Sequence, residues 1–155
     1  MRTAARLDHI EPFYVMECAK VAWEIAESPA CDPQQGGEPM IFLNIGEPDF
    51  TAPPQVQEAA VRSIHDGATQ YTQATGLLKL RERISGWYAT RFGVDIPASR
   101  IVVTAGASAA LQLACLALID AGDEILMPDP SYPCNRHFVS AAEGAAVLIP
   151  TTAAE

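Results

Sequence analysis

The residues with the clearest chemical potential form a small turn, Gly106-Ala107-Ser108, which follows a β-branched run and precedes an apolar segment with helical spacing. Small side chains leave the backbone amides of Ala107 and Ser108 open to an anion, and the Ser108 hydroxyl adds a further donor. A phosphate group suits such a set of donors. The same residues also fit a plain connection in which Ser108 or Thr104 only caps the helix.

A second turn with chemical potential places Tyr132 among rigid prolines, in the run Pro128-Asp129-Pro130-Ser131-Tyr132-Pro133. An aromatic ring in this setting can stack on a flat cofactor. The structural alternative is that Tyr132 packs against the next helix.

The elements that must position these turns are predicted to form a parallel sheet with helices. A strand at Ile101–Val103, an apolar helix and a strand at Glu124–Met127 follow one another, and Gly122 between the last two can adopt the left-handed conformation. A strand-helix-strand unit implies parallel pairing, and ligands bind beyond the carboxyl ends of parallel strands. Both turns lie at that edge.

The rest of the chain is predicted to alternate helices with short β-rich runs. Helices are expected over 12–27, 54–66, 77–92 and 133–142, and β-rich runs over 40–45 and 145–149. In the helix over 77–92 the charged residues are expected to form a solvated face; they are Lys79, Arg81, Glu82 and Arg83. His9, His65 and His137 are expected to have structural roles.

Two further positions are candidate binding residues. Gly46 opens a turn over 46–50, where its backbone either approaches a ligand or belongs to an acidic surface loop. Tyr71 lies in a polar segment, 69–76, that has no obvious role in a core.

Four stretches together resemble the class I/II aminotransferase family, whose members use pyridoxal phosphate. In the family's order they are PFYVMECAKVAWEI at 12–25, LNIGEPDF at 43–50, YTQATGLLKLRERI at 71–84 and VTAGASAALQLACLALIDAGDEILMPDPSYP at 103–133. The resemblance implies an α/β fold: a mostly parallel sheet with flanking helices, as a partial large domain of an aspartate aminotransferase-like fold. It implies an amino-terminal arm, helix and loop at 1–39 and an incomplete pyridoxal-phosphate-binding large domain at 40–155.

The resemblance also implies a role for each candidate residue. Gly106, Ala107 and Ser108 bind the cofactor phosphate, and Tyr132 stacks on the pyridine ring. Tyr71 completes the phosphate site of a neighbouring subunit, so a homodimer is expected, and Gly46 meets the substrate carboxylate. The implied cofactor is pyridoxal 5′-phosphate, and the implied substrates are an amino acid and a 2-oxo acid.

The family's Schiff-base lysine has no counterpart in this sequence. The chain has only Lys20 and Lys79, each in an amphipathic helix and neither in a context that resembles the catalytic one. We therefore expect the amino-terminal portion of a longer enzyme or a truncated gene product, inactive by itself. A same-fold C–S lyase or decarboxylase and a non-catalytic ligand-binding or regulatory domain remain alternatives, because the residues that distinguish them are expected beyond residue 155.

Composition excludes several other classes of protein. The net charge of -9 argues against binding to nucleic acid or to an anionic membrane. The four cysteines have no metal-ligand spacing and are expected to be free thiols, and no secretory leader is visible over 1–13, so a cytoplasmic location is expected. The uncharged stretch 101–119 is better explained by a strand and a buried helix than by a membrane span.

Overall fold

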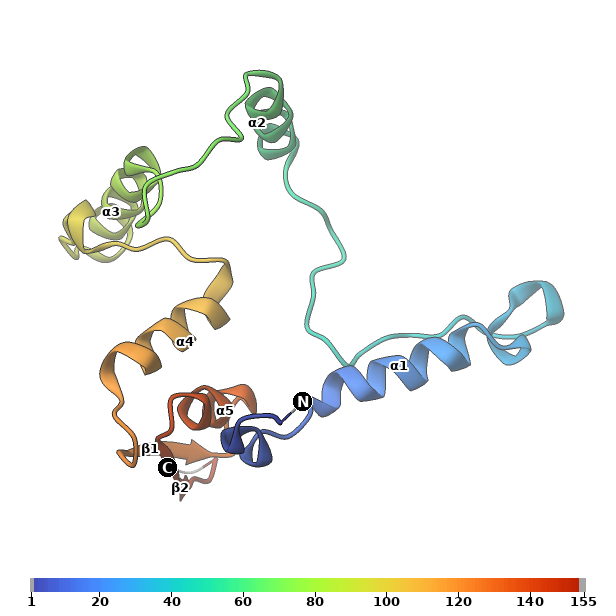
Figure 1. Cartoon of the computed structure of the whole chain (residues 1–155). Coiled ribbons are helices and arrows are strands. Elements are labelled where there is room, and N and C mark those ends of the chain that lie inside the picture. Colours follow the sequence, from blue (N-terminus) through green and yellow to red (C-terminus); the bar gives the residue numbers. More distant parts are fainter. Residues whose placement is uncertain (1, 154–155) are drawn as a thin grey trace. The chain divides into compact units, whose positions relative to one another are not determined.

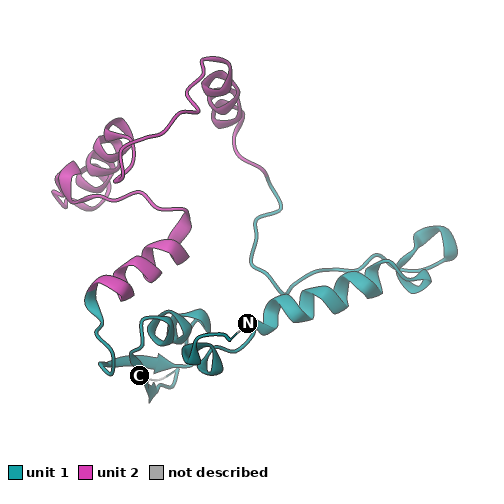
Figure 2. Ribbon diagram, in the orientation of Figure 1, with its two compact units in different colours: residues 1–50, 118–155 teal, residues 51–117 magenta. Residues whose placement is uncertain are grey.

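The computed structural model describes residues 2–153, which form two compact units (Figures 1 and 2). The first unit contains the described residues up to Phe50 and from Leu118 onward, shown in teal in Figure 2. The second contains Thr51–Ala117, shown in magenta. Each unit has its own internal contacts.

The amino-terminal part of the first unit is helical and loop-rich. It contains the short 3-10 helices η1 (Ala5–His9), η2 (Pro29–Cys31) and η3 (Pro33–Gln35) and the α-helix α1 (Tyr14–Ala26). Helix α1 confirms the prediction over 12–27, although it starts after Pro12, with Phe13 at the N-cap. Ala19 is buried, and the Trp23 ring lies 4.5 Å from that of Phe42.

The carboxyl-terminal part of the first unit is a strand-helix-strand unit. Strand β1 (Glu124–Asp129), helix α5 (Cys134–Ala141) and strand β2 (Ala145–Pro150) follow in order, and the two strands pair in parallel from Glu124 opposite Ala145 to Asp129 opposite Pro150. Val139 of α5 is 1% exposed, so the apolar face of this helix forms the local core. The predicted helix over 133–142 and the predicted strands over 124–127 and 145–149 are confirmed.

Two backbone hydrogen bonds join the turn before β1 to the turn before β2. The Gly122 amide donates to the Glu143 carbonyl oxygen at 2.9 Å, and the Ala145 amide donates to the Asp123 carbonyl oxygen at 2.8 Å. Gly122 has a φ of 91°, which glycine adopts without steric cost, so the prediction for Gly122 is confirmed. The starts of the two strands are thereby aligned.

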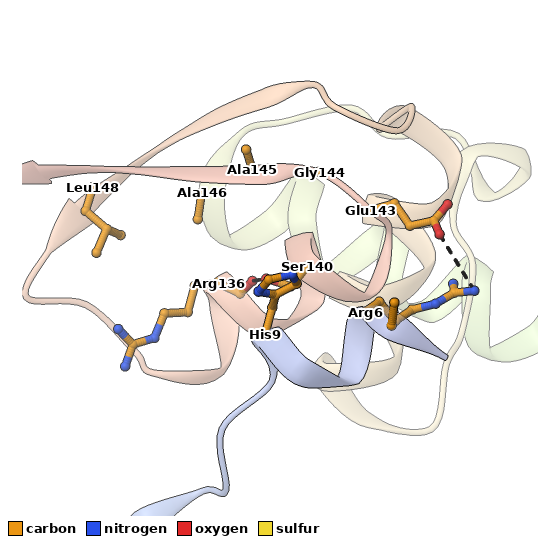
Figure 3. A pocket seen from close by; sticks show the side chains of 10 residues that line it. Arg6, His9, Arg136, Ser140, Glu143, Gly144, Ala145, Ala146 and Leu148 are labelled. Carbon is orange, nitrogen blue, oxygen red and sulfur yellow. Dashed lines mark hydrogen bonds and ion pairs between the residues drawn. The ribbon is translucent and has the colours of Figure 1, made fainter. Parts of the chain in front are cut away.

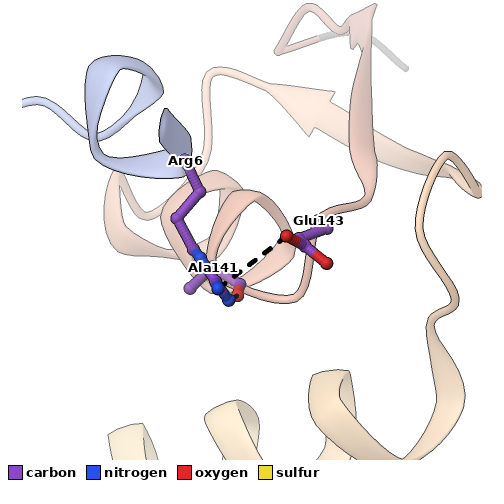
Figure 4. Close-up of polar contacts among 3 residues, drawn as sticks. All are labelled: Arg6, Ala141 and Glu143. Atoms are coloured by element: carbon purple, nitrogen blue, oxygen red, sulfur yellow. Dashed lines mark hydrogen bonds and ion pairs between the residues drawn. The ribbon is translucent and has the colours of Figure 1, made fainter. Parts of the chain in front are cut away.

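The amino-terminal arm docks on helix α5. The Arg6 guanidinium donates to the Ala141 carbonyl oxygen at 3.4 Å and lies 3.8 Å from a carboxylate oxygen of Glu143 (Figure 4). Both side chains are about half exposed, so this ion pair stabilises the docked arm only weakly.

The second unit consists of helices joined by extended segments. It contains α2 (Pro54–His65), α3 (Leu78–Phe92), the 3-10 helix η4 (Ala98–Arg100) and α4 (Gly106–Leu118), whose last residue lies in the first unit. Helix α3 ends at Gly93, whose φ of 68° is left-handed and whose amide donates to the Ala89 carbonyl oxygen. These helices confirm the predictions over 54–66 and 77–92.

Two predicted β-rich runs do not form strands. Ile101–Val103 is extended, but its backbone amides donate outside any strand: the Ile101 amide to the Ala98 carbonyl oxygen at 3.2 Å and the Val103 amide to the Thr75 carbonyl oxygen at 3.0 Å. The run over 40–45 is likewise unpaired. A strand needs a neighbouring strand to satisfy its backbone groups, and within residues 2–153 only β1 and β2 provide one for each other.

Large apolar side chains remain exposed on the helices of the second unit. Trp87, Tyr88 and Phe92 of α3 form an aromatic cluster, with ring centroids 5.0–5.6 Å apart, and yet all three are at least 36% exposed. Leu111, Leu113 and Leu116 of α4 are also exposed. Within residues 2–153, no helix combines the length and apolar character needed to cross a bilayer.

Candidate functional site: the amino end of helix α4 and its surroundings

The turn predicted to bind phosphate forms the start of helix α4. The Thr104 hydroxyl donates to the Gly106 carbonyl oxygen at 2.8 Å, and the Gly106 amide donates to the Thr104 carbonyl oxygen at 2.9 Å. Gly106 has a φ of 84°, and a Cβ added there would have no heavy atom within 4 Å. The need for glycine at this position therefore comes from the backbone conformation and not from lack of space.

Ala107 and Ser108 lie in the first turn of α4, where backbone amides have no acceptor within the helix. The dipole of this 13-residue helix adds partial positive charge at the same end. The Ser108 side chain is exposed and supplies a hydroxyl donor. This set of neutral donors fits a phosphate group.

Tyr71 lies in the same unit, on the loop before α3. Its side chain is fully exposed, at 106%, and residues 69–72 line a shallow cavity of about 360 Å³. The end of this loop is fixed, because Thr75 accepts the hydrogen bond from Val103 and Gly76 accepts one from Arg81. An anchored loop thus presents a free phenol to the surroundings.

The prediction that Arg81 belongs to a solvated face is wrong. Arg81 is 8% exposed, and its guanidinium donates to three oxygens, on Gln73, Gly76 and Ala98. Helical spacing could have predicted the burial of Arg81, because residue 81 lies four positions after Leu77 and three before Ile84 and so lies on the same helix face as these two apolar residues. Charge alone suggested exposure, but the long side chain reaches backbone carbonyls that need a donor.

Tyr132 lies just after β1, at the carboxyl end of that strand as predicted. Its ring meets the Phe13 ring edge-on, with centroids 6.0 Å apart and an interplanar angle of 75°, and remains 50% exposed. The pKa of Tyr132 is raised above its ordinary value of 10.0 by two effects of Cys134. The larger is a hydrogen bond with the Cys134 side chain, and the second is the negative charge of that side chain when it is ionised. Sequence reasoning missed Phe13, whose contact with Tyr132 spans 119 positions and leaves no local pattern.

Gly46 does not have the unusual backbone conformation that the sequence suggested. Its φ lies outside the left-handed region in which six other glycines are found, and a Cβ there would meet no heavy atom within 4 Å. Its neighbours Ile45 and Glu47 line a cavity of about 270 Å³ together with Trp23 and Phe42. Any contact of Gly46 with a ligand would therefore use an ordinary backbone conformation.

A cavity of about 570 Å³ lies elsewhere in the first unit, where η1 faces α5 and β2 (Figure 3). Arg6, Arg136 and Glu143 give its lining mixed charge. None of the predicted binding residues lines it. Those residues divide between the units: Tyr71 and Gly106–Ser108 share the second unit, and Gly46 and Tyr132 share the first.

Comparison with known proteins identifies the family. The model of the family described as aminotransferase class I and II matches residues 38–155. The chain belongs to this aminotransferase family. The match includes three of the four stretches on which the resemblance was based, and the prediction of the family is confirmed.

Curated relatives of this aminotransferase chain carry transaminase names. A (5-formylfuran-3-yl)methyl phosphate transaminase from Methanocaldococcus jannaschii is 37% identical over 134 residues, which is 86% of this chain and 34% of the relative. An aspartate aminotransferase from Pyrococcus horikoshii is 39% identical over 113 residues, which is 73% of this chain and 29% of the relative. The chain spans about a third of the length of the curated relatives it matches.

Solved aminotransferase structures share the fold. An aminotransferase from Mycobacterium tuberculosis matches 99% of this chain, with a TM-score of 0.85 and 34% identity, and 38% of its own chain is covered. The aspartate aminotransferase of Thermotoga maritima matches 98%, with a TM-score of 0.84 and 32% identity, and 38% of its chain is covered. The predicted fold class, part of an aspartate aminotransferase α/β fold, is confirmed.

Proposed function

We propose that this chain forms the amino-terminal part of a pyridoxal-phosphate-dependent aminotransferase, which transfers an amino group between an amino acid and a 2-oxo acid. Residues 40–155 belong to the cofactor-binding large domain, and residues 1–39 form the arm, helix and loop before it. The family match over residues 38–155 carries the proposal. The neutral donors at the start of α4 support it, because they suit the phosphate of this cofactor.

Gly106, Ala107 and Ser108 hold the cofactor phosphate in this proposal. The amides of Ala107 and Ser108 and the Ser108 hydroxyl donate to phosphate oxygens, and the left-handed Gly106 starts the helix so that these donors face outward. Binding a dianion at a helix amino terminus is favourable because the dipole and the free amides act together.

Tyr132 stacks on the cofactor ring. Its half-exposed ring has Phe13 at one side, which restricts its orientation through an edge-on contact. The Tyr132 phenol is neutral at physiological pH, as any tyrosine near its ordinary pKa is, so it places no negative charge beside the cofactor. Ring contact and not acid–base chemistry is therefore the proposed role of Tyr132.

Tyr71 completes the phosphate site of a partner subunit, and the proposed assembly is a homodimer. A fully exposed phenol on an anchored loop supports this role, because the hydroxyl is free to donate to a group outside its own chain. The exposed aromatic cluster of α3 is consistent with further covered surface in the assembled enzyme. Gly46 is proposed to meet the substrate carboxylate through its backbone.

The reactive lysine is not proposed within this chain. Pyridoxal phosphate, when bound, supplies an aldehyde that accepts the amino group and a ring that withdraws electrons from the substrate. Lys20 bonds to Glu17 on the surface of α1, and Lys79 lies on the exposed side of α3. We therefore propose that the 155-residue chain alone does not catalyse transfer. The free thiols found at all four cysteines are consistent with the proposed cytoplasmic location.

The test is cofactor binding by the full-length enzyme of which this chain is proposed to be a part, purified from its natural gene. The cofactor-free protein is titrated with pyridoxal phosphate and, separately, with pyridoxal, which lacks the phosphate. We expect much tighter binding of pyridoxal phosphate, and we expect that adding an amino acid converts bound cofactor to its amine form with release of a 2-oxo acid. Equal affinity for the two compounds would contradict the phosphate site. Release of carbon dioxide or of a thiol in place of the 2-oxo acid would identify a decarboxylase or a C–S lyase.

A further inference from the structure

The Arg81 side chain is a buried cation whose observed hydrogen-bond partners are carbonyl oxygens and not carboxylates. It is 8% exposed, and none of the ion pairs found within residues 2–153 includes it. Burying an arginine is costly unless its donors are satisfied, so the observed contacts indicate what this side chain stabilises.

The guanidinium of Arg81 joins three points of the second unit. Its Nη2 donates to Gln73 Oε1 at 2.8 Å and its Nε to the Gly76 carbonyl oxygen at 3.2 Å, both on the loop before α3. Its Nη1 donates to the Ala98 carbonyl oxygen at 3.0 Å, in η4, which follows α3 in the chain. One planar group thus links the loop over 71–76 to the segment over 98–103.

A second set of contacts joins the same two segments. The Val103 amide donates to the Thr75 carbonyl oxygen at 3.0 Å. A Cβ added to Gly76 would lie 2.6 Å from Val103 Cβ, so the Val103 side chain packs against Gly76 as closely as a glycine allows. The next residue after Val103 is Thr104, whose hydroxyl fixes Gly106 at the start of α4.

We propose that Arg81 is a positioning residue that sets the loop carrying Tyr71 and the turn Gly106–Ser108 in a fixed arrangement. This inference rests on the proposed function, in which both elements bind cofactor phosphate. In the proposed dimer, Tyr71 serves the partner's cofactor and Gly106–Ser108 serves the chain's own. Arg81 therefore links the phosphate contacts of two cofactor sites from within one chain.

The planar fork of arginine is required for this role. Three acceptors lie around the guanidinium edge, and lysine offers a single charged nitrogen that cannot reach all three. We expect R81K to behave like R81Q and not like the wild type. Gln73→Ala removes one acceptor from an exposed loop residue without opening a core, and it is the variant least prone to misfolding.

The experiment measures the affinity of the cofactor-free natural protein for pyridoxal phosphate and for pyridoxal. R81Q, R81K and Q73A are compared with R83Q, a control on the same helix whose side chain is exposed. We expect R81Q and R81K to weaken pyridoxal phosphate binding by about tenfold or more, the effect of losing hydrogen bonds to a charged donor, and Q73A by a smaller factor. Pyridoxal affinity stays within about twofold for every variant, because it has no phosphate to lose.

The outcomes separate this inference from the proposed function. If the wild type prefers pyridoxal phosphate and the Arg81 and Gln73 variants keep that preference, the positioning role is wrong and the proposed function stands. If the variants lose affinity for both compounds equally, Arg81 has a general structural role and the inference is again wrong. If the wild type itself binds both compounds equally, the proposed function fails and the inference fails with it.

Discussion

Gly144 lies directly against Val139, and a Cβ added to Gly144 would approach Val139 Cγ1 to 3.0 Å and Ile119 Cγ2 to 2.7 Å. Val139 is 1% exposed, so it has little room to move. We expect Gly144→Ala to destabilise the protein by about 1–3 kcal/mol through overpacking. Urea unfolding monitored by circular dichroism measures the change.

Gly86→Ala provides a matched control for this prediction. Gly86 lies within helix α3, and a Cβ there would have no neighbour within 4 Å. Alanine is the better helix former, so we expect a gain of up to about 1 kcal/mol. If the two substitutions change the free energy of unfolding equally, the close contacts of Gly144 with Val139 and Ile119 do not limit a side chain at position 144.

Ser108→Ala tests the hydroxyl at the proposed phosphate site. We expect it to weaken pyridoxal phosphate binding by about three- to tenfold, the value of one hydrogen bond, because the two backbone amides remain. Ser99→Ala in η4 is the control, since its side chain is also exposed. Titration of the cofactor-free protein with pyridoxal phosphate measures the affinity of both variants. If S108A binds the cofactor as tightly as S99A, Ser108 is not part of the phosphate site.

Tyr71→Phe tests the proposed contribution of one subunit to the cofactor of the other. We expect about tenfold weaker pyridoxal phosphate binding, with the proposed dimer unchanged in sedimentation, because only the hydroxyl is lost. Tyr14→Phe, at an exposed tyrosine of α1, is the control. Unchanged affinity in Y71F would mean that the exposed phenol does not reach a phosphate.

The pH dependence of stability tests the contact between Tyr132 and Cys134. The folded-state pKa of Tyr132 is raised, so the folded protein holds the phenol proton more tightly than the unfolded chain. The resulting stabilisation is complete below the unfolded pKa of about 10 and is lost as the pH rises through the folded pKa. We expect Cys134→Ala to return the pKa of Tyr132 toward 10.0, measured by ultraviolet difference titration against Tyr132→Phe. An unchanged titration midpoint would show that Cys134 is not the cause.

Elements set by local pattern could be predicted from the sequence. The positions of α2, α3 and α5 follow from apolar spacing, from Pro54 at a helix start and from Gly93 after a helix end. Strands β1 and β2 were predicted from short β-rich runs that border helices, but the parallel partner expected for β1 was Ile101–Val103, and in the structure β1 pairs with β2.

Features that depend on distant partners could not be predicted. Ile101–Val103 has strand composition but no neighbouring strand within residues 2–153, so composition alone predicted a strand where none forms. The burial of Arg81 depends on Gln73 and Ala98, which are joined only after α3 has formed. The roles of Ser108 and Tyr132 stay predictions, since they depend on a ligand and not on local pattern.

The strand-helix-strand unit over 124–150 has a consequence for the order of folding. Its hydrogen bonds join residues 21 and 22 positions apart, Gly122 with Glu143 and Asp123 with Ala145, and the strand pairing lies entirely within this one supersecondary unit. We expect this unit to gain protection from hydrogen exchange first. The extended segments at 40–45 and 101–103 would then gain protection only later, because neither has a paired strand of its own.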